Sequence, residues 1–409
     1  MSSRIIVTGM GVVSALGWTP TAIWQAMEAG YSGLGPLTLF ASPRCGHFPV
    51  GQVQGDPAQS SGLSRGSRSD HLAAYAASMA FLDAGLDKVP ATIRKSIGLV
   101  LGGTTGGMLD TESFFLRVVR EGFVEGSLLR HHECCHPANA TAELLGLNGF
   151  RATQSTACSS GLMAIATACD VLKAGEAEIM LAGGVDSLTR LTLNGFASLL
   201  IIAPDGCRPF DARRTGMSLG EGAAVLVLER EETALARKAP MLAEIGGFAH
   251  TCEAHHPTAP TPDGAGIYQA MALALQRAGL TPADVDYVNA HGTGTIDNDL
   301  AEGRALSRLF GEAPPPISST KRFFGHTLGA AGAIETVVCI LALQNQRVPG
   351  TLGLLHPDPK IPIKPLLAPV SATVKTALNN SLGFGGACSS LVIGQVGFGR
   401  NGAVQDDRP

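Results

Sequence analysis

The chain has 409 residues, of which 45% are hydrophobic, 16% are charged and 51 are glycine. This apolar content provides enough surface for a packed core and excludes a disordered or fibrous protein. The formal net charge of −4 excludes a global positive field of the kind that attracts nucleic acid or anionic membranes.

In the first half of the chain, apolar periodicity and turn residues predict helices and strands in alternation. A helix is predicted over 70–85, and a strand over 97–101 leads into a glycine-rich turn. A long apolar helix over 158–173 and a strand over 178–182 follow. A further strand is predicted over 223–228.

The second half repeats this order, with a helix predicted over 264–278, a strand over 285–289 and a small-residue helix over about 328–344. The recurrence predicts two similar α/β halves around one core, each with a parallel sheet covered on both faces. We place the parts at 1–240, 241–397 and, as a loose polar tail, 398–409.

The nine cysteines are odd in number and lack the paired spacing of zinc ribbons, which predicts reduced thiols in a cytoplasm. We expect no membrane span, because the sequence holds no uninterrupted apolar run of the required length. The segment 131–136, HHECCH, is rich in metal-binding side chains. Adjacent residues cannot all face one ion unless the loop folds back, so we expect no metal site.

The most informative segment is STACSSG, which places Cys158 where small residues pass into an apolar helix. The positive end of the helix dipole favours a thiolate, which would make this residue a nucleophile. Taken alone, a cysteine in such a place is more often a buried structural residue.

Two histidines change this balance. His291 ends a predicted strand in NAHGTGT, and His326 precedes a helix in GHTLGAAG. Both lie in glycine-rich turns at the ends of predicted elements, where binding and catalytic sites are usually built. We therefore expect them to converge on Cys158.

Four motifs in this order, STACSSG, NAHGTGT, STKRFFGHTLGAAGAIE and NSLGFGG, resemble those of the elongating β-ketoacyl-acyl-carrier-protein synthases, which belong to the thiolase superfamily. The resemblance covers roughly residues 3–396. It implies a thiolase-like α/β fold with two duplicated αβαβα halves in five layers. It also implies decarboxylative condensation of malonyl-carrier protein with an enzyme-bound acyl group, which gives a 3-oxoacyl thioester and CO₂.

The resemblance also implies roles for individual residues. Cys158 would carry the acyl group, and its N–H and that of Phe384 would form the oxyanion hole. Phe384 also matches a gating residue at the acyl pocket. His291 and His326 would stabilise the enolate that decarboxylation leaves.

Four other positions match supporting residues of the family. Lys321 and Glu335 match a charged pair that would orient the site, although a purely structural buried ion pair is an equal alternative. Thr293 and Thr295 match residues that bind the pantetheine arm.

The implied partner is an acidic acyl carrier protein, whose phosphopantetheine holds the substrates, and no further cofactor is implied. Arg65, Arg68 and Arg208 match or neighbour basic docking positions, where charges steer encounter. The chain is expected to form a homodimer, or a heterodimer with a homologous chain-length-factor subunit.

The sequence departs from the family where Ala387 and Cys388 replace the usual Thr-Asn. The segment 197–207 and the stretch before Ala138 are short and apolar compared with the corresponding segments of the fatty-acid enzymes of this family. These changes suggest an altered substrate preference, such as a specialised polyketide or polyene pathway. The alternative activity is that of a thiolase, which would use Cys158 and Cys388.

Overall fold

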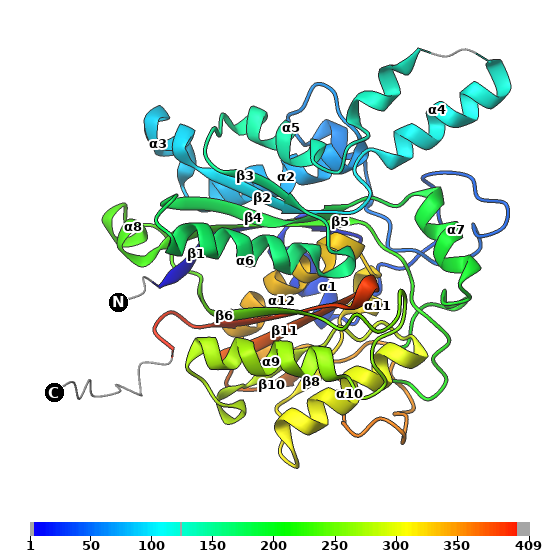
Figure 1. Ribbon diagram of the computed structural model, residues 1–409, viewed down its shortest axis with the longest axis vertical. Helices are drawn as coiled ribbons and strands as arrows, with labels where there is room; N and C mark the ends of the chain where they lie inside the picture. Colours follow the sequence, from blue (N-terminus) through cyan, green and yellow to red (C-terminus); the bar gives the residue numbers. More distant parts are fainter. Residues whose placement is uncertain (1–3, 123–124, 399–409) are drawn as a thin grey trace.

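The computed structural model describes residues 4–122 and 125–398 (Figure 1). Its framework is a ten-stranded sheet. From one edge to the other, the strands are β3 (Arg151–Gln154), β2 (Gly98–Gly102), β4 (Ile179–Asp186), β5 (Gly222–Arg230), β1 (Ile5–Ser14), β6 (Ala243–Cys252), β12 (Ala387–Gly394), β11 (Thr376–Gly383), β7 (Tyr287–Asn289) and β8 (Ile317–Ser318). A separate small sheet pairs β9 (Arg347–Val348) with β10 (Val370–Ser371).

The strands connect through helices that cover both faces of the sheet. In chain order the helices are α1 (Pro20–Glu28), α2 (Arg68–Asp83), α3 (Ala91–Ser96), α4 (Met108–Glu121), α5 (His136–Leu145), α6 (Ser160–Lys173), α7 (Arg190–Ser198), α8 (Glu231–Ala236), α9 (Ala265–Ala278), α10 (Ile296–Phe310), α11 (Lys321–Phe324) and α12 (Ala331–Asn345). The predicted helices and strands are all present, with ends shifted by a few residues.

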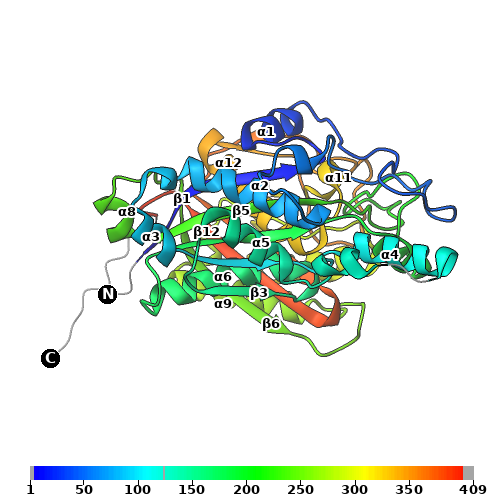
Figure 2. The same cartoon turned by 90° about the horizontal axis from the view of Figure 1, so that it is seen from above.

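Five layers follow from the way these elements pack (Figures 1 and 2). Helix α2 lies on strands β1, β4 and β5, and α9 lies on β6 and β12. Helices α6 and α12 lie between the two halves of the sheet and contact each other. Because they are enclosed on all sides, both carry apolar residues around most of their circumference. The predicted five-layered fold is confirmed.

The prediction of purely parallel sheets was wrong. Strand β2 runs parallel to β3 and β4, and β7 runs parallel to β8 and β11. The strands nearest the centre are antiparallel, including β5 against β1 and β11 against β12. Only residues 384–386 separate β11 from β12, and so short a connection joins antiparallel strands, whereas parallel ones need a crossover.

The two halves of the sequence occupy opposite ends of the sheet. Across the sheet, the strands of residues 1–240 come first, in the order β3, β2, β4, β5 and β1. The strands of residues 241–397 follow, in the order β6, β12, β11, β7 and β8. The exact division at residue 240 stays a prediction. Of the predicted tail, residues 399–409 lie outside the described part. Phe398 is not loose, because it packs against a core cluster of the second half.

One helical segment among the described residues, Leu328–Asn345, has the length and hydropathy of a membrane span, and 89% of it is buried inside the protein. Its apolar character is explained by its central position between the two halves of the sheet.

Candidate active site

Cys158 lies in the short 3₁₀ turn Ala157–Ser159, immediately before α6. Ala157 has a φ of 52°, a left-handed conformation that is unfavourable for a residue with a side chain and is often found at functional sites. The turn is held by Ser160, whose Oγ donates to the carbonyl of Ala157 at 2.6 Å and accepts from the N–H of Thr156 at 2.9 Å. The turn therefore presents Cys158 at the end of the central layer.

The thiol of Cys158 is only 6% exposed. Burial raises its pKa to about 12, although Lys321 and the backbone N–H groups of Phe384 and Cys158 act in the opposite direction. The effect of burial on this pKa therefore exceeds the effect that we expected from the helix dipole, because burial strongly disfavours the charged form. The nucleophile rests as a thiol.

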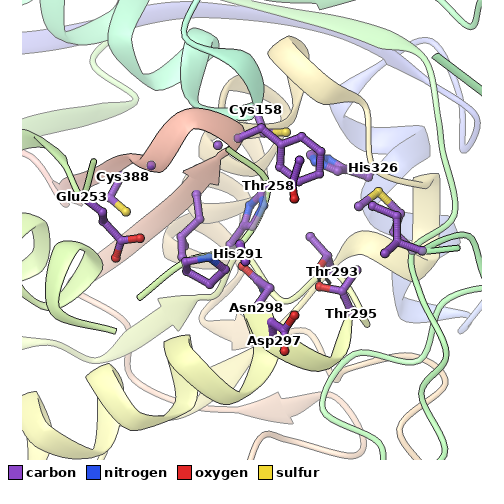
Figure 3. Close-up of a pocket in the computed structure, with 18 residues that line it drawn as sticks. Cys158, Glu253, Thr258, His291, Thr293, Thr295, Asp297, Asn298, His326 and Cys388 are labelled. Atoms are coloured by element: carbon purple, nitrogen blue, oxygen red, sulfur yellow. Dashed lines mark hydrogen bonds between the residues drawn. The ribbon is translucent and has the colours of Figure 1, made fainter. Parts of the chain in front are cut away.

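His291 and His326 reach the same place from the second half of the chain. His291 follows β7 and His326 follows α11, and their exposed fractions are 2% and 1%. The two rings meet edge to face, with centroids 5.1 Å apart. Figure 3 shows both rings and Cys158 around one space, a cavity of about 80 Å³ that all three line.

Both imidazoles are neutral at physiological pH. Burial lowers the pKa of each well below its usual value, and the charge of Lys321 lowers it further. Lys321 Nζ lies 3.5 Å from Nδ1 of His291. Since an ammonium group can only donate, Nδ1 accepts and the single ring proton is assigned to Nε2. His291 thus offers an N–H donor on the side away from Lys321.

Lys321 also forms an ion pair with Glu335 on α12, and both side chains are fully buried. Burial raises the pKa of Glu335, and Lys321 lowers it. An ion pair with a purely structural role would not need contact with the site. Here the lysine touches His291 as well, which favours the orienting role that the resemblance implied.

Glu302, which the sequence motifs did not reveal, holds the loop that carries His291. Its carboxylate accepts from the backbone N–H groups of His291 and Gly292, both at 2.8 Å, and burial raises its pKa to about 7. The sequence signal that could have revealed Glu302 is its place on α10 one helical turn after Asp299, which puts both carboxylates on the same side of the helix. Asp299 itself accepts from the N–H of Gly294 at 3.1 Å.

Asp186, at the end of β4, is a second residue that the sequence motifs did not reveal. Its carboxylate accepts from the backbone N–H and hydroxyl groups of Thr104 and Thr105, at 2.7–2.8 Å. It also accepts from the N–H of Gly329 at 2.7 Å. One buried carboxylate therefore ties a loop of the first half to the loop that follows His326.

Phe384 separates two cavities. It lines the cavity that contains the histidines and also a more apolar cavity of about 210 Å³, and Cys158 reaches both. Its ring packs against Phe196 of α7, with centroids 5.5 Å apart. A Cβ on Gly383 would come within 3.2 Å of the Cys158 nitrogen, so the glycine lets the loop approach the nucleophile.

The second cavity has the character of an acyl-binding pocket. Its lining is mostly apolar and consists of Thr104, Thr105, Met108, Ala157, Cys158, Leu191, Thr192, Phe196, Leu328 and Phe384. The first cavity is more polar. Thr293 and Thr295, whose hydroxyls lie 2.9 Å apart, contribute to its wall, as expected for residues that bind a polar substrate arm.

The three arginines predicted to dock a partner differ in their surroundings. Arg65 is exposed and Arg208 is half-buried. The Arg68 guanidinium binds the buried carboxylate of Glu221, with Nε to Oε2 at 2.9 Å, and it is 12% exposed. Arg68 is therefore paired inside the protein, and its role as a docking residue stays a prediction.

Cys388, at the start of β12, lines the first cavity together with Cys158. It lies beside Glu253 (Figure 3), and burial raises the pKa of its thiol strongly. A thiolase-type acid/base cysteine must exchange a proton with substrate. A buried thiol near a carboxylate is poorly suited to that exchange.

The chain matches two family models, the β-ketoacyl synthase N-terminal domain over residues 2–234 and its C-terminal domain over residues 242–355. It is 37% identical over 407 residues to "Nodulation protein E" of Rhizobium meliloti (strain 1021), covering 97% of this chain and 100% of the relative. It is 36% identical to "3-oxoacyl-[acyl-carrier-protein] synthase 2" of Synechocystis sp., covering 94% and 96%.

Among solved structures, the chain is similar to "The ishigamide ketosynthase/chain length factor", with a TM-score of 0.92 and 32% identity over 97% of this chain and 100% of that one. The matches favour a synthase over the alternative thiolase, and they agree with the fold and motifs described above.

Proposed function

Because the chain belongs to the β-ketoacyl synthase family of condensing acyltransferases, we propose that it elongates an acyl group carried on Cys158 with two carbons from a malonyl thioester. The observation that carries this assignment is the meeting of Cys158, His291 and His326 at one cavity, with Lys321 on the far side of His291. The product is a 3-oxoacyl thioester.

In the first step, the Cys158 sulfur attacks the thioester carbonyl of the incoming acyl group. The N–H groups of Cys158 and Phe384 stabilise the oxyanion. This role is supported by the fact that both N–H groups lower the pKa of the Cys158 thiol, which places them beside the sulfur. The C–S bond to the carrier breaks as the bond to Cys158 forms. The thiol proton leaves with the departing phosphopantetheine thiol, so no resting thiolate is needed.

In the second step, malonyl thioester enters the polar cavity and loses CO₂, and negative charge develops on its thioester oxygen. The neutral imidazoles of His291 and His326 provide N–H donors for that oxygen. The enolate carbon then attacks the carbonyl on Cys158, and the released sulfur takes up one proton. Donors that are fixed before the reaction stabilise its transition state without reorganisation.

The proposed substrate carrier is an acyl carrier protein, as the name of the cyanobacterial relative specifies for that enzyme. Its phosphopantetheine arm would lie along Thr293 and Thr295. Arg65 and Arg208 remain proposed docking residues, and no further cofactor is proposed.

The proposed assembly is a dimer through β3, which forms one edge of the ten-stranded sheet. Edge strands offer unpaired backbone groups to a second chain. The partner is a second copy or a homologous chain-length subunit. The similarity to a solved ketosynthase/chain length factor structure favours a specialised pathway of the heterodimeric type over fatty-acid synthesis. With its nine free cysteines, we place the protein in the cytoplasm.

The test supplies the purified protein with two substrates, a carrier protein loaded with malonyl and a carrier protein loaded with an acyl group. The variant Cys158→Ala and the matched control Cys388→Ala are assayed in the same way. Mass spectrometry follows the 3-oxoacyl product, and CO₂ release is measured in parallel. We expect the product from the parent and the control, and none from Cys158→Ala. Equal loss in both variants would favour the thiolase arrangement. An inert parent that becomes active with a co-expressed homologous subunit would establish the heterodimer.

A further inference from the structure

A group of metal-binding side chains lies apart from the catalytic cysteine and histidines. His131 ends the 3₁₀ segment Gly126–His131, and His136 begins α5. The chain between them folds back, so the two rings meet edge to face with centroids 4.5 Å apart. Asp70, in the first turn of α2, completes the group, and one ligand atom from each residue lies within 4.8 Å of the others.

The His136 ring lies between the other two groups. Its Nδ1 is 2.9 Å from Asp70 Oδ1, and its Nε2 is 3.2 Å from His131 Nδ1. Donation from Nδ1–H to the carboxylate leaves Nε2 with a free lone pair, which is the arrangement in which a carboxylate orients a metal-binding histidine.

The spacing also fits one ion. Two nitrogens bound at 2.0–2.1 Å in a tetrahedral site stand about 3.3 Å apart, close to the 3.2 Å between His131 Nδ1 and His136 Nε2. Asp70 Oδ2 lies 3.6 Å from His131 Nδ1, so the carboxylate that orients His136 also places its negative charge beside His131.

Charge and access favour a cation at this place. Asp70 is fully buried, and the N–H of Ser67 fixes its Oδ2 at 2.6 Å. Asp110 of α4 interacts electrostatically with both Asp70 and His131, which places a second carboxyl group close by. The side chains of His131 and His136 are 21% and 26% exposed, so an ion can enter from solvent.

We propose that His131 and His136 bind one divalent transition-metal ion of the zinc type, with Asp70 orienting His136 and water completing the coordination. Imidazole nitrogens suit such ions, and a carboxylate behind the ring raises the basicity of the ligand. The expectation of no metal site rested on a loop that does not fold back, and it did not include Asp70, which is distant in the sequence.

A bound ion would stabilise the segment that supports one wall of the apolar cavity beside Cys158. A Cβ on Gly107 would meet the His131 carbonyl at 2.0 Å, so the metal-binding segment packs directly on the loop that leads to Met108. Met108 lines the apolar cavity beside Cys158. An ion that joins this segment to α5, whose His136 is hydrogen-bonded to α2 through Asp70, would stabilise the folded protein in proportion to its occupancy.

The test is a titration of the chelator-treated full chain with Co²⁺, followed by visible absorption, and with Zn²⁺, followed by calorimetry. We expect one ion per chain and weak d–d bands without the strong near-ultraviolet absorption of a cobalt thiolate. His131→Gln and His136→Gln should each weaken binding by more than about 100-fold, because loss of a ligand exceeds the effect of losing a group that only orients one.

Two matched controls separate this site from other donors. His132→Gln changes the neighbouring histidine, which hydrogen-bonds Thr111, and Cys134→Ser/Cys135→Ser removes the nearby thiols. Both should bind Co²⁺ like the parent, and circular dichroism checks that every variant is folded. The proposal is overturned if the parent binds no ion, if the His131 variant binds normally, or if binding is lost with the thiols.

Discussion

Lys321 Nζ lies 3.5 Å from Nδ1 of His291 while it is paired with the buried carboxylate of Glu335. This contact fixes which nitrogen of the neutral imidazole carries the proton. Without the lysine, the proton is free to move to Nδ1, and Nε2 becomes an acceptor that cannot stabilise an enolate.

A Lys321→Met variant should therefore decarboxylate malonyl-carrier protein on the order of 100-fold more slowly at pH 8, the usual effect of losing one preorganised donor. Removing the cation also raises the pKa of His291, since Lys321 now lowers it. Burial, the larger cause, still holds this pKa below 6.5 in the variant, so the loss of activity should persist as the pH falls towards 6. Unchanged decarboxylation by Lys321→Met would contradict this role.

The buried histidines should make the protein sensitive to acid. An unfolded histidine binds a proton below about pH 6.5, whereas His326 in the folded protein stays neutral well below that value. Its contribution to stability is present above pH 6.5 and is lost as the pH falls, by about 1.4 kcal/mol per pH unit.

Urea unfolding of the parent and of His326→Gln between pH 7.5 and 5.5 measures this difference. Over this whole range the variant should lose about 1.4 kcal/mol less than the parent, because only the part below about pH 6.5 contributes. Glu302, whose pKa is also shifted, is present in both proteins and cancels. Equal slopes would mean that His326 is protonated in the folded state.

Arg65 and Arg68 provide a matched pair. Arg68→Ala leaves the buried Glu221 carboxylate without its cation and should lower the free energy of unfolding by about 3 kcal/mol. Arg65→Ala, at an exposed position, should change stability by less than about 0.5 kcal/mol. It should instead lower kcat/KM for carrier-bound substrates, most strongly at low salt. Unfolding curves and kinetics at two salt concentrations distinguish the two roles.

Phe384 is expected to limit access to Cys158, because it lies between the two cavities that share this residue. Phe384→Ala should raise the rate of Cys158 alkylation by a small haloacetamide several-fold, as followed by peptide mass spectrometry. The backbone N–H that acts on the sulfur is retained. Phe196→Ala removes the packing partner and should have a smaller effect. An unchanged rate in Phe384→Ala would exclude gating by this ring.

The nucleophile and the two histidines could be predicted because each lies in a short motif of small residues whose meaning is local. The two α/β halves were visible for the same reason, since helix and strand periods are local patterns. The direction of the strands near the centre of the sheet could not be predicted, because it depends on which distant strands pair.

The residues that were missed act across the chain. Asp186 binds the N–H of Gly329, 143 positions away, and no local pattern marks such a contact. Arg68 looked like a surface charge because its partner Glu221 is 153 positions away. The raised pKa of Cys158 could not be predicted from its motif, since its burial depends on both halves of the fold.

The most direct test of the proposed chemistry is the site of acylation. The parent and Cys388→Ala are each incubated with a carrier protein that is loaded with an acyl group, in the absence of malonyl-carrier protein. The reactions are quenched in acid and analysed as intact protein and as peptides. We predict one acyl group per active chain in both proteins, attached to the peptide that contains Cys158. An acyl group on Cys388, or on any residue other than Cys158, would contradict the assignment of the nucleophile.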